Sequence, residues 1–178
     1  LASEKLVLLL ALPPKTCRGQ TGLLCEAHDF RVLGRNADLC VLKNASVALG
    51  APSALAGIGR MNEAVRYAVS EIPAKKLLCS LPAGGLQWAL PWHQGQRARP
   101  LAGAQAAEQA VQVGAPIRYD DAAQAPHYNF WRGGTEQEVW FEDARSYRAK
   151  CALAAEYRLG GVAVPEAAQW YSQLWGIL

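Results

Sequence analysis

The apolar residues of this chain follow two patterns, short continuous runs and longer stretches with a repeat of three to four residues. Short runs of this kind occupy residues 6–12, 37–42, 76–81 and 162–164, interrupted by Asp38, Lys76 and Ser80. Runs of this length without alternation are typical of strands that are buried on both faces of a parallel sheet. Residues 53–72 place apolar side chains at helical spacing, which predicts a helix that packs on such a sheet. Alternating strands and helices indicate a parallel α/β fold.

The segment 137–165 gives the clearest single prediction. Val139, Trp140 and Phe141 favour a strand, and Asp143 can cap a following helix because its carboxylate accepts free backbone N–H groups. Residues 144–159 are rich in helix formers, and we expect the pair Gly160-Gly161 to end that helix in a left-handed turn.

The middle of the chain predicts a different kind of structure. Residues 82–100 are rich in Gly, Pro and Trp, which favours a loop or an irregular strand. Residues 101–113 are rich in alanine and predict a helix. Residues 117–141 predict two or three short antiparallel strands, with Gly133-Gly134 as a hairpin turn.

Composition excludes several function classes. A net charge of +3 without a basic run interleaved with aromatics does not indicate nucleic-acid binding, and no apolar stretch is long enough to span a membrane. The five cysteines are scattered without a CxxC pair, and the three histidines lack metal-ligand spacing. We therefore expect free thiols rather than a disulfide framework, and neither a metal nor another cofactor.

The first residues allow more than one interpretation. The chain begins with Leu1 instead of Met, which indicates a processed or excised segment. Residues 6–12 follow Lys5 and could form the core of a signal peptide, but Pro13-Pro14 stands where small cleavage-site residues are expected. A buried strand is the interpretation that we prefer.

Several segments resemble, in order, the final part of glycoside hydrolase family 18. They are Glu26-Ala-His-Asp-Phe, Glu71-Ile-Pro-Ala-Lys-Lys-Leu-Leu, Ile117-Arg-Tyr-Asp-Asp-Ala-Ala-Gln-Ala-Pro-His-Tyr-Asn-Phe and Trp140-Phe-Glu-Asp-Ala-Arg-Ser with the helix and Gly-Gly turn that follow. The likeness is greatest to the bacterial spore-germination and cortex-lytic members, which resemble chitinases. It implies a bacterial protein of the spore or cell envelope.

The resemblance implies an α/β fold, namely the C-terminal half of a TIM (β/α)8 barrel with a small α+β insertion. The chain, at 178 residues, is shorter than the roughly 250 residues of a complete barrel. Residues 1–85 and 142–178 would form the partial barrel, with strands that match the fifth to eighth, and residues 86–141 the insertion that walls one side of a sugar groove.

The resemblance also implies where catalytic residues should lie. Family members carry an Asp/Glu motif on the fourth strand, and this chain has no matching motif, so we assign it no catalytic residue. At three further site positions the family has Tyr, Tyr and Trp, whereas this chain has Ala45, Gly84 and Pro165. These replacements remove two hydroxyls and the indole under the reacting sugar, which indicates a site that no longer catalyses.

Other carboxylates have simpler roles. Asp120 and Asp121 are adjacent in a predicted strand and should point to opposite faces, and Glu142-Asp143 is better explained as a helix cap. The remaining candidates for contact with sugar are Trp88, Trp92, Tyr119, Asp120 and Tyr128, for several of which packing of the insertion's core is the alternative.

Three functions stay open. The chain could be a degenerate family 18-like domain, inactive as given, that binds N-acetylglucosamine-containing glycans such as chitin fragments or peptidoglycan. It could be the C-terminal portion of an active chitinase-like or cortex-lytic N-acetylglucosaminidase whose acid lies in a missing N-terminal half. It could instead be a structural or interaction protein, with its barrel edge paired to that missing half or to a second copy.

Overall fold

The structure is a computed structural model of the protein and describes residues 6–44, 50–164 and 176. The chain divides into two compact units. The first comprises Leu1–Ala45, Gly59–Leu81 and Lys150–Val164, and the second Ser46–Ile58, Pro82–Ala149 and Pro165–Leu178. The predicted limits of the insertion, 86 and 141, fall inside a segment of the second unit, so the division between barrel and insertion stays a prediction.

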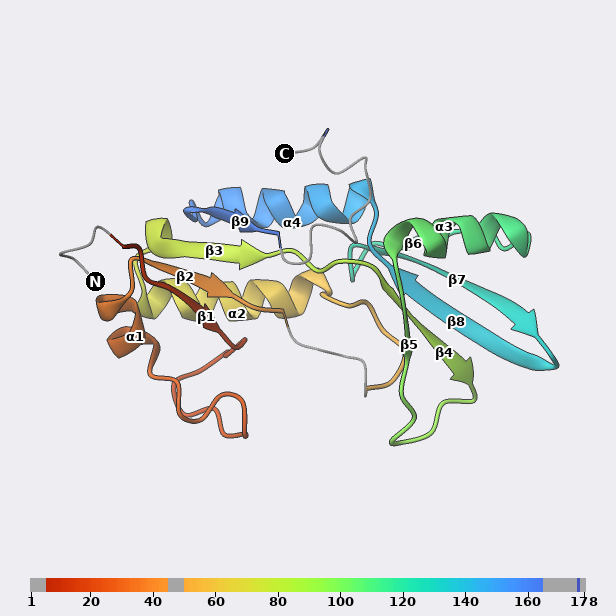
Figure 1. Cartoon of the computed structure of the whole chain (residues 1–178), viewed down its shortest axis with the longest axis horizontal. Coiled ribbons are helices and arrows are strands. Elements are labelled where there is room, and N and C mark those ends of the chain that lie inside the picture. The colour runs from red at the N-terminus through yellow and green to blue at the C-terminus, as the bar shows by residue number, and fades with distance from the viewer. Residues whose placement is uncertain (1–5, 45–49, 165–175, 177–178) are drawn as a thin grey trace. The chain divides into compact units, whose positions relative to one another are not determined.

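The first unit contains a parallel sheet in the order β1-β2-β3-β9 (Figure 1). Its strands are β1 (Leu9–Leu12), β2 (Leu39–Leu42), β3 (Leu77–Ser80) and β9 (Gly161–Ala163). Each strand overlaps one of the continuous apolar runs and pairs in parallel with its neighbour. The α/β prediction is confirmed for these runs, and residues 6–12 contribute a sheet strand.

Helix α1 (Phe30–Asn36) is closed at both ends by side chains. At its start, the Asp29 carboxylate accepts the backbone N–H of Val32 at 3.1 Å. At its end, the ammonium group of Lys76 donates to the carbonyls of Gly34 and Ala37, at 3.1 and 2.8 Å. A cation at a helix C-terminus satisfies carbonyls that lack an intrahelical partner.

Helix α2 (Ile58–Glu71) buries the stripe Met61, Ala64, Val65 and Ala68, as the periodicity predicts. It begins five residues later than the predicted Ser53. Ala54 belongs instead to a hydrophobic cluster of the second unit, and the N–H of Ile58 donates to the carbonyl of Ala123 at 3.0 Å. Tertiary packing overrides the helical spacing of residues 53–57.

Helix α4 (Ala144–Glu156) is capped by Asp143, as predicted. The Asp143 carboxylate accepts the backbone N–H groups of Arg145 and Ser146 at 2.9 and 3.0 Å. The prediction for the other end is wrong in detail, because the left-handed residue is Arg158, with φ of 52°. Gly160 is needed for a different reason, since a side chain there would collide with the carbonyl of Lys75.

The second unit contains a five-stranded antiparallel sheet in the order β5-β4-β8-β7-β6. Its strands are β4 (Gly85–Leu90), β5 (Arg99–Leu101), β6 (Arg118–Asp120), β7 (Ala125–Arg132) and β8 (Thr135–Phe141). Gly133 and Gly134 form the β7–β8 turn with φ of 58° and 78°, which confirms the predicted hairpin. Residues 82–100, predicted as a loop or an irregular strand, contain β4 as a regular strand that pairs with both β5 and β8.

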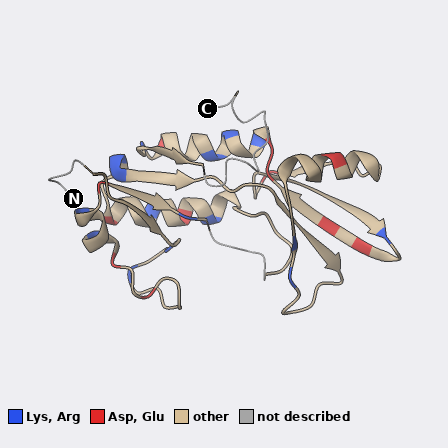
Figure 2. Ribbon diagram, viewed as in Figure 1, with Lys and Arg blue, Asp and Glu red and all other residues tan. Residues whose placement is uncertain are grey.

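The two faces of this sheet differ. Helix α3 (Gly103–Gln112) contributes Ala106 and Ala110 to a cluster with Tyr128, Phe130, Val139 and Phe141. On the opposite face, Leu86, Trp88 and Trp140 pack with Ala54, Ala98 and Ala125. Further along this second face, toward the β7–β8 turn, the side chains become polar and exposed, and Figure 2 shows acidic bands on β8.

Candidate functional site

The carboxyl ends of the parallel strands are where sites form in barrel folds. In the first unit, the described residues that follow these strands include Lys15 after β1, Lys43 and Asn44 after β2, and Leu81 after β3. The Asn44 side-chain amide donates to the carbonyl of Ser80, which ties the ends of β2 and β3 together. None of the described residues immediately after these four strands is an aspartate or a glutamate.

Lys15 is a buried cation at these strand ends, with an exposed fraction of 2%. Its ammonium group donates to the carbonyls of Arg18 and His28, at 3.2 and 3.1 Å, and lies 6.0 Å from the centre of the Phe30 ring. These contacts fix the loop after β1. Sequence reasoning did not single out Lys15, because a lysine in a polar loop carries no signal of burial.

Of the three positions at which the sequence resemblance predicts a lost site residue, the structure describes Gly84. Its backbone has φ of 80°, and a β-carbon at this position would collide with the carbonyl oxygen of Leu101. A tyrosine is therefore incompatible with the local backbone, since L-residues rarely adopt this conformation and no space exists. The other two positions, Ala45 and Pro165, lie outside the described residues.

Two of the predicted sugar contacts are enclosed by protein. Trp88 has an exposed fraction of 0%, and its indole N–H donates to the carbonyl of Gly50 at 3.0 Å. The Tyr128 hydroxyl donates to the carbonyl of Ala106 at 2.8 Å, and burial raises the pKa of Tyr128 to about 12. Both rings pack the interior in this structure, so neither offers a free face for stacking.

Tyr119 and Asp120 are half-buried on the edge strand β6. The Arg145 guanidinium covers the Tyr119 ring at 4.5 Å, and the Tyr119 hydroxyl donates to Gln124 at 3.1 Å. Burial, followed by the charge of Asp143, raises the pKa of Tyr119. The Asp120 carboxylate accepts the N–H of Ala123 at 2.7 Å and thereby forms a local turn.

Trp92 is the remaining predicted contact. Its ring packs against the cluster around Trp88 and is half-buried, and its indole nitrogen has no hydrogen-bond partner among the described residues. Buried indole N–H groups usually find an acceptor, so this nitrogen marks a place where a ligand or water could bind.

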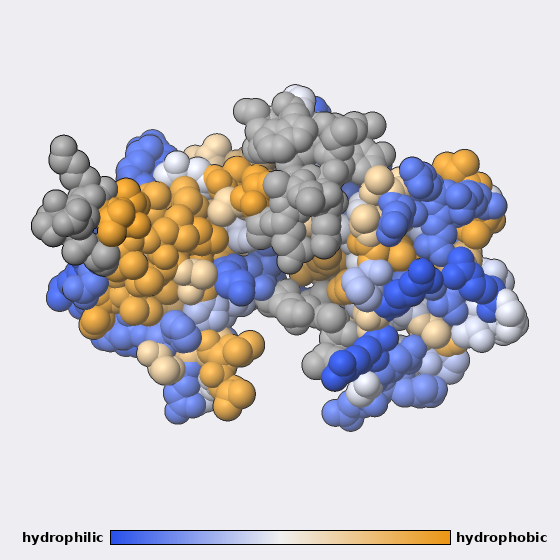
Figure 3. Space-filling view, in the orientation of Figure 1, coloured by the Kyte–Doolittle hydropathy of each residue, from blue (hydrophilic) through white to orange (hydrophobic). Residues whose placement is uncertain are grey.

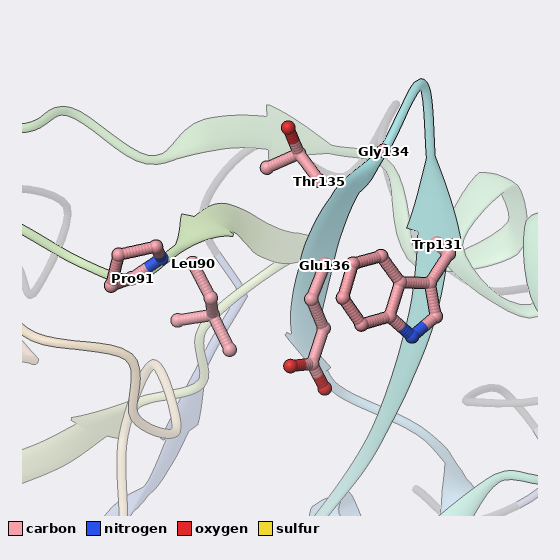
Figure 4. A pocket seen from close by; sticks show the side chains of 6 residues that line it. All are labelled: Leu90, Pro91, Trp131, Gly134, Thr135 and Glu136. Atoms are coloured by element: carbon pink, nitrogen blue, oxygen red, sulfur yellow. The ribbon is translucent and has the colours of Figure 1, made fainter.

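The structure adds one feature that sequence reasoning did not find. A pocket of about 470 Å³ lies at the hairpin end of the second unit's sheet and is lined by Leu90, Pro91, Trp131, Gly134, Thr135 and Glu136 (Figure 4). Trp131, near the hairpin end of β7, is 71% exposed. The predicted hairpin contained a signal for this pocket. Trp131 and Glu136 lie on either side of the Gly133-Gly134 turn, and residues in these positions pair across the two strands.

Among the described residues, no group of three His, Cys, Asp or Glu side chains could hold a metal ion. No described helix is long and apolar enough to cross a membrane. All five cysteines are free, with Cys40 and Cys79 buried. Burial raises the pKa of Cys79 to about 11, which keeps this thiol protonated and unreactive.

Comparison with known proteins places this arrangement in a family. The cortical fragment-lytic enzyme of Bacillus cereus is 36% identical over 171 residues, which are 94% of this chain and 40% of that protein. The spore cortex-lytic enzyme SleL of Bacillus megaterium superimposes with a TM-score of 0.92 at 36% identity, over 98% of this chain and 41% of that one. The chain is a homologue of the spore cortex-lytic enzymes.

A chitinase from Chromobacterium violaceum extends the relationship to family 18 chitinases. It is 25% identical, with a TM-score of 0.90, over 99% of this chain and 55% of that protein. The parallel strands of the first unit thus belong to part of a family 18 TIM barrel, and the chain spans about 40% of the length of its curated relatives. No protein-family profile matches the sequence.

Proposed function

We propose that this chain recognises N-acetylglucosamine-containing glycans of the peptidoglycan or chitin type and, as given, does not hydrolyse them. The observation that carries the second half is that no stretch of this sequence matches the Asp/Glu motif that family members carry on the fourth strand. Family 18 hydrolysis needs a glutamic acid to protonate the leaving oxygen and an aspartate to orient the acetamide. Lys15, Lys43 and Asn44 can fill neither role.

Glycan recognition is supported by the relatives and by the aromatic residues of the second unit. The Bacillus relatives are named for action on spore cortex or cortical fragments, and a chitinase shares the fold. Trp92 has a half-buried ring whose indole nitrogen has no hydrogen-bond partner in the described part of the chain, and Trp131 is exposed beside Glu136. Indole rings with nearby polar groups suit the mixed apolar and hydroxylated surface of a pyranose.

Isothermal titration of the purified chain with chitotetraose tests this proposal, with cellotetraose as the matched control without acetamido groups. We expect saturable binding of chitotetraose that is at least about tenfold tighter than that of cellotetraose, or about 1.4 kcal/mol. Equal affinity for the two sugars, or no binding of either, contradicts recognition of acetamido sugars.

The comparisons fit an active hydrolase equally well, if residues outside this sequence supply the acid. Gly84 favours the inactive domain over the active hydrolase. The sequence resemblance implies a tyrosine at this position, and the backbone leaves no room for one. We place the inactive domain first because that hydroxyl would still be missing after the acid was restored.

An interaction role is a second candidate, and the outer edge of β1 favours it. Leu6, Val7 and Leu9 are 57%, 68% and 49% exposed, and Figure 3 shows a broad apolar area over the strands of the first unit. No described strand pairs with the second edge of β1. Open apolar edges favour pairing with another strand, from further residues of the same protein or from a second copy.

A further inference from the structure

Three residues cross the second unit's sheet in one row near the β7–β8 turn. Leu90 on β4 pairs with Glu136 on β8, and Glu136 pairs with Trp131 on β7. Directly paired residues of neighbouring strands point to the same face, so the three side chains form one continuous surface. Figure 4 shows the Glu136 carboxylate beside the Trp131 indole, while Thr135 projects to the other side.

Trp131 supplies an open aromatic face. Its side chain is 71% exposed, in contrast to Trp88 and Trp140, which are 0% and 9% exposed on the same face of the sheet. The flat indole carries negative charge on its face. The C–H bonds on one side of a pyranose ring present a weakly positive, apolar surface, so the two surfaces match in shape and in polarity.

Glu136 supplies an acceptor whose orientation is fixed. One carboxylate oxygen, Oε1, accepts the side-chain N–H of Asn129 at 3.0 Å. No described residue donates to the second oxygen, so Oε2 can accept from a ligand. A carboxylate that is already oriented loses less side-chain entropy when it binds a hydroxyl, and its charge strengthens that hydrogen bond.

The pocket also has an apolar side. Leu90 and Pro91 line it opposite Trp131, and its volume of about 470 Å³ lies within the usual range for small-molecule sites. A cationic ligand would satisfy Trp131 and Glu136 but would leave Leu90 and Pro91 without apolar contact. A sugar with an acetamido group satisfies all four, since its methyl group can pack on Leu90 and Pro91.

We propose that this pocket binds one acetamido-pyranose unit of a glycan, stacked on Trp131 with a ring hydroxyl bonded to Glu136. The site is separate from the barrel strand ends, and the choice of an N-acetylglucosamine oligomer as probe rests on the proposed function. A site at the end of this sheet would hold the glycan without taking part in bond cleavage.

The test is a ¹H–¹⁵N NMR titration of the whole chain with chitotetraose, which follows the indole N–H signals of the six tryptophans. Trp131→Ala and Glu136→Gln are the test variants, and Val111→Ala, at a site 80% exposed on α3, is the control. Both test positions lie at the surface or half-buried, so the fold should persist, and thermal melts of every variant check this. Nα-acetyl-lysine amide serves as a cationic probe.

We expect the Trp131 indole signal to shift on addition of chitotetraose, with affinity at least about tenfold lower in Trp131→Ala and Glu136→Gln and unchanged in Val111→Ala. Chitotetraose binding that is equal in all variants overturns this site while leaving the proposed function in place. Stronger binding of the lysine amide than of the sugar at Trp131 also overturns it. Absence of any glycan binding contradicts this site and the proposed glycan recognition together.

Discussion

Gly84 lies against the carbonyl oxygen of Leu101, with a backbone φ of 80° and no room for a β-carbon. Strand pairing around this contact holds it in place. Gly85 pairs with both Leu101 and Phe141, and the N–H of Glu142 donates to the carbonyl of Gly84 at 3.0 Å. The backbone at this position therefore needs glycine, whereas the sequence resemblance predicts a tyrosine here in family 18.

Substitution of Gly84 should destabilise the chain. We expect Gly84→Ala to lower the free energy of unfolding by about 2 kcal/mol or more, because left-handed strain adds to a collision with the Leu101 carbonyl. Gly84→Tyr should destabilise at least as much and should not create hydrolytic activity. Urea denaturation measures both variants.

Gly95 is the matched control for this experiment. Its φ is 88°, close to that of Gly84, but a β-carbon there would meet nothing within 4 Å. Gly95→Ala should show the strain alone, about 1 kcal/mol. Equal losses of stability at the two glycines would mean that the contact with Leu101 imposes no constraint.

Asp143 should act as a helix cap and not as a catalytic group. Asp143→Ala removes the acceptor for the N–H groups of Arg145 and Ser146, and we expect a loss of about 1 kcal/mol in the free energy of unfolding. Asp143→Asn retains a capping oxygen and should lose much less. Neither variant should alter chitotetraose binding, and a selective loss of binding would assign Asp143 to the site.

Tyr128 should make stability fall in strongly alkaline solution. The folded pKa of about 12 lies above the ordinary value of 10.0, so the unfolded chain loses the proton first as the pH rises. The stabilisation is fully present below pH 10 and is lost between about pH 10 and 12. In Tyr128→Phe the decline over this range should be smaller, whereas an unchanged decline would assign it to other groups.

The β1 edge should govern self-association. Val7→Lys places a charge on a residue that is 68% exposed beside the open edge of β1, and we expect it to shift the chain toward monomer. Val111→Lys, on the exposed side of α3, is the control and should leave the distribution unchanged. Sedimentation velocity measures both variants, and a wild-type chain that is already monomeric contradicts self-association through β1.

Periodicity predicted the parallel sheet because its strands lie in short, largely apolar runs, and for residues 6–12 the alternative of a signal-peptide core was less favoured because Pro13-Pro14 follows. It did not separate a loop from a strand at β4, where Leu86, Trp88 and Leu90 alternate with Gln87 and Ala89, because glycines and prolines lie on either side. The start of α2 was also misplaced, since Ala54 finds its partners in the second unit. Local sequence does not contain that tertiary contact.

Site residues were harder to predict than the fold. The exposure of an aromatic residue depends on which face of which strand it occupies, and the sequence alone does not show that Trp88 is buried and Trp131 exposed. The capping role of Asp143 was predictable because its partners lie two and three residues away. The constraint at Gly84 was not predictable, because it depends on the carbonyl of Leu101, which lies 17 residues further along the chain.

The most direct measurement is a hydrolysis time course with the purified chain. Cortical muropeptides and chitotetraose would each be incubated with increasing amounts of protein, and the products would be counted by mass spectrometry. Our account predicts no product above the protein-free blank, in samples where titration shows that the sugar is bound. Product that increases in proportion to the amount of this chain would contradict it and would mean that a complete catalytic centre exists here.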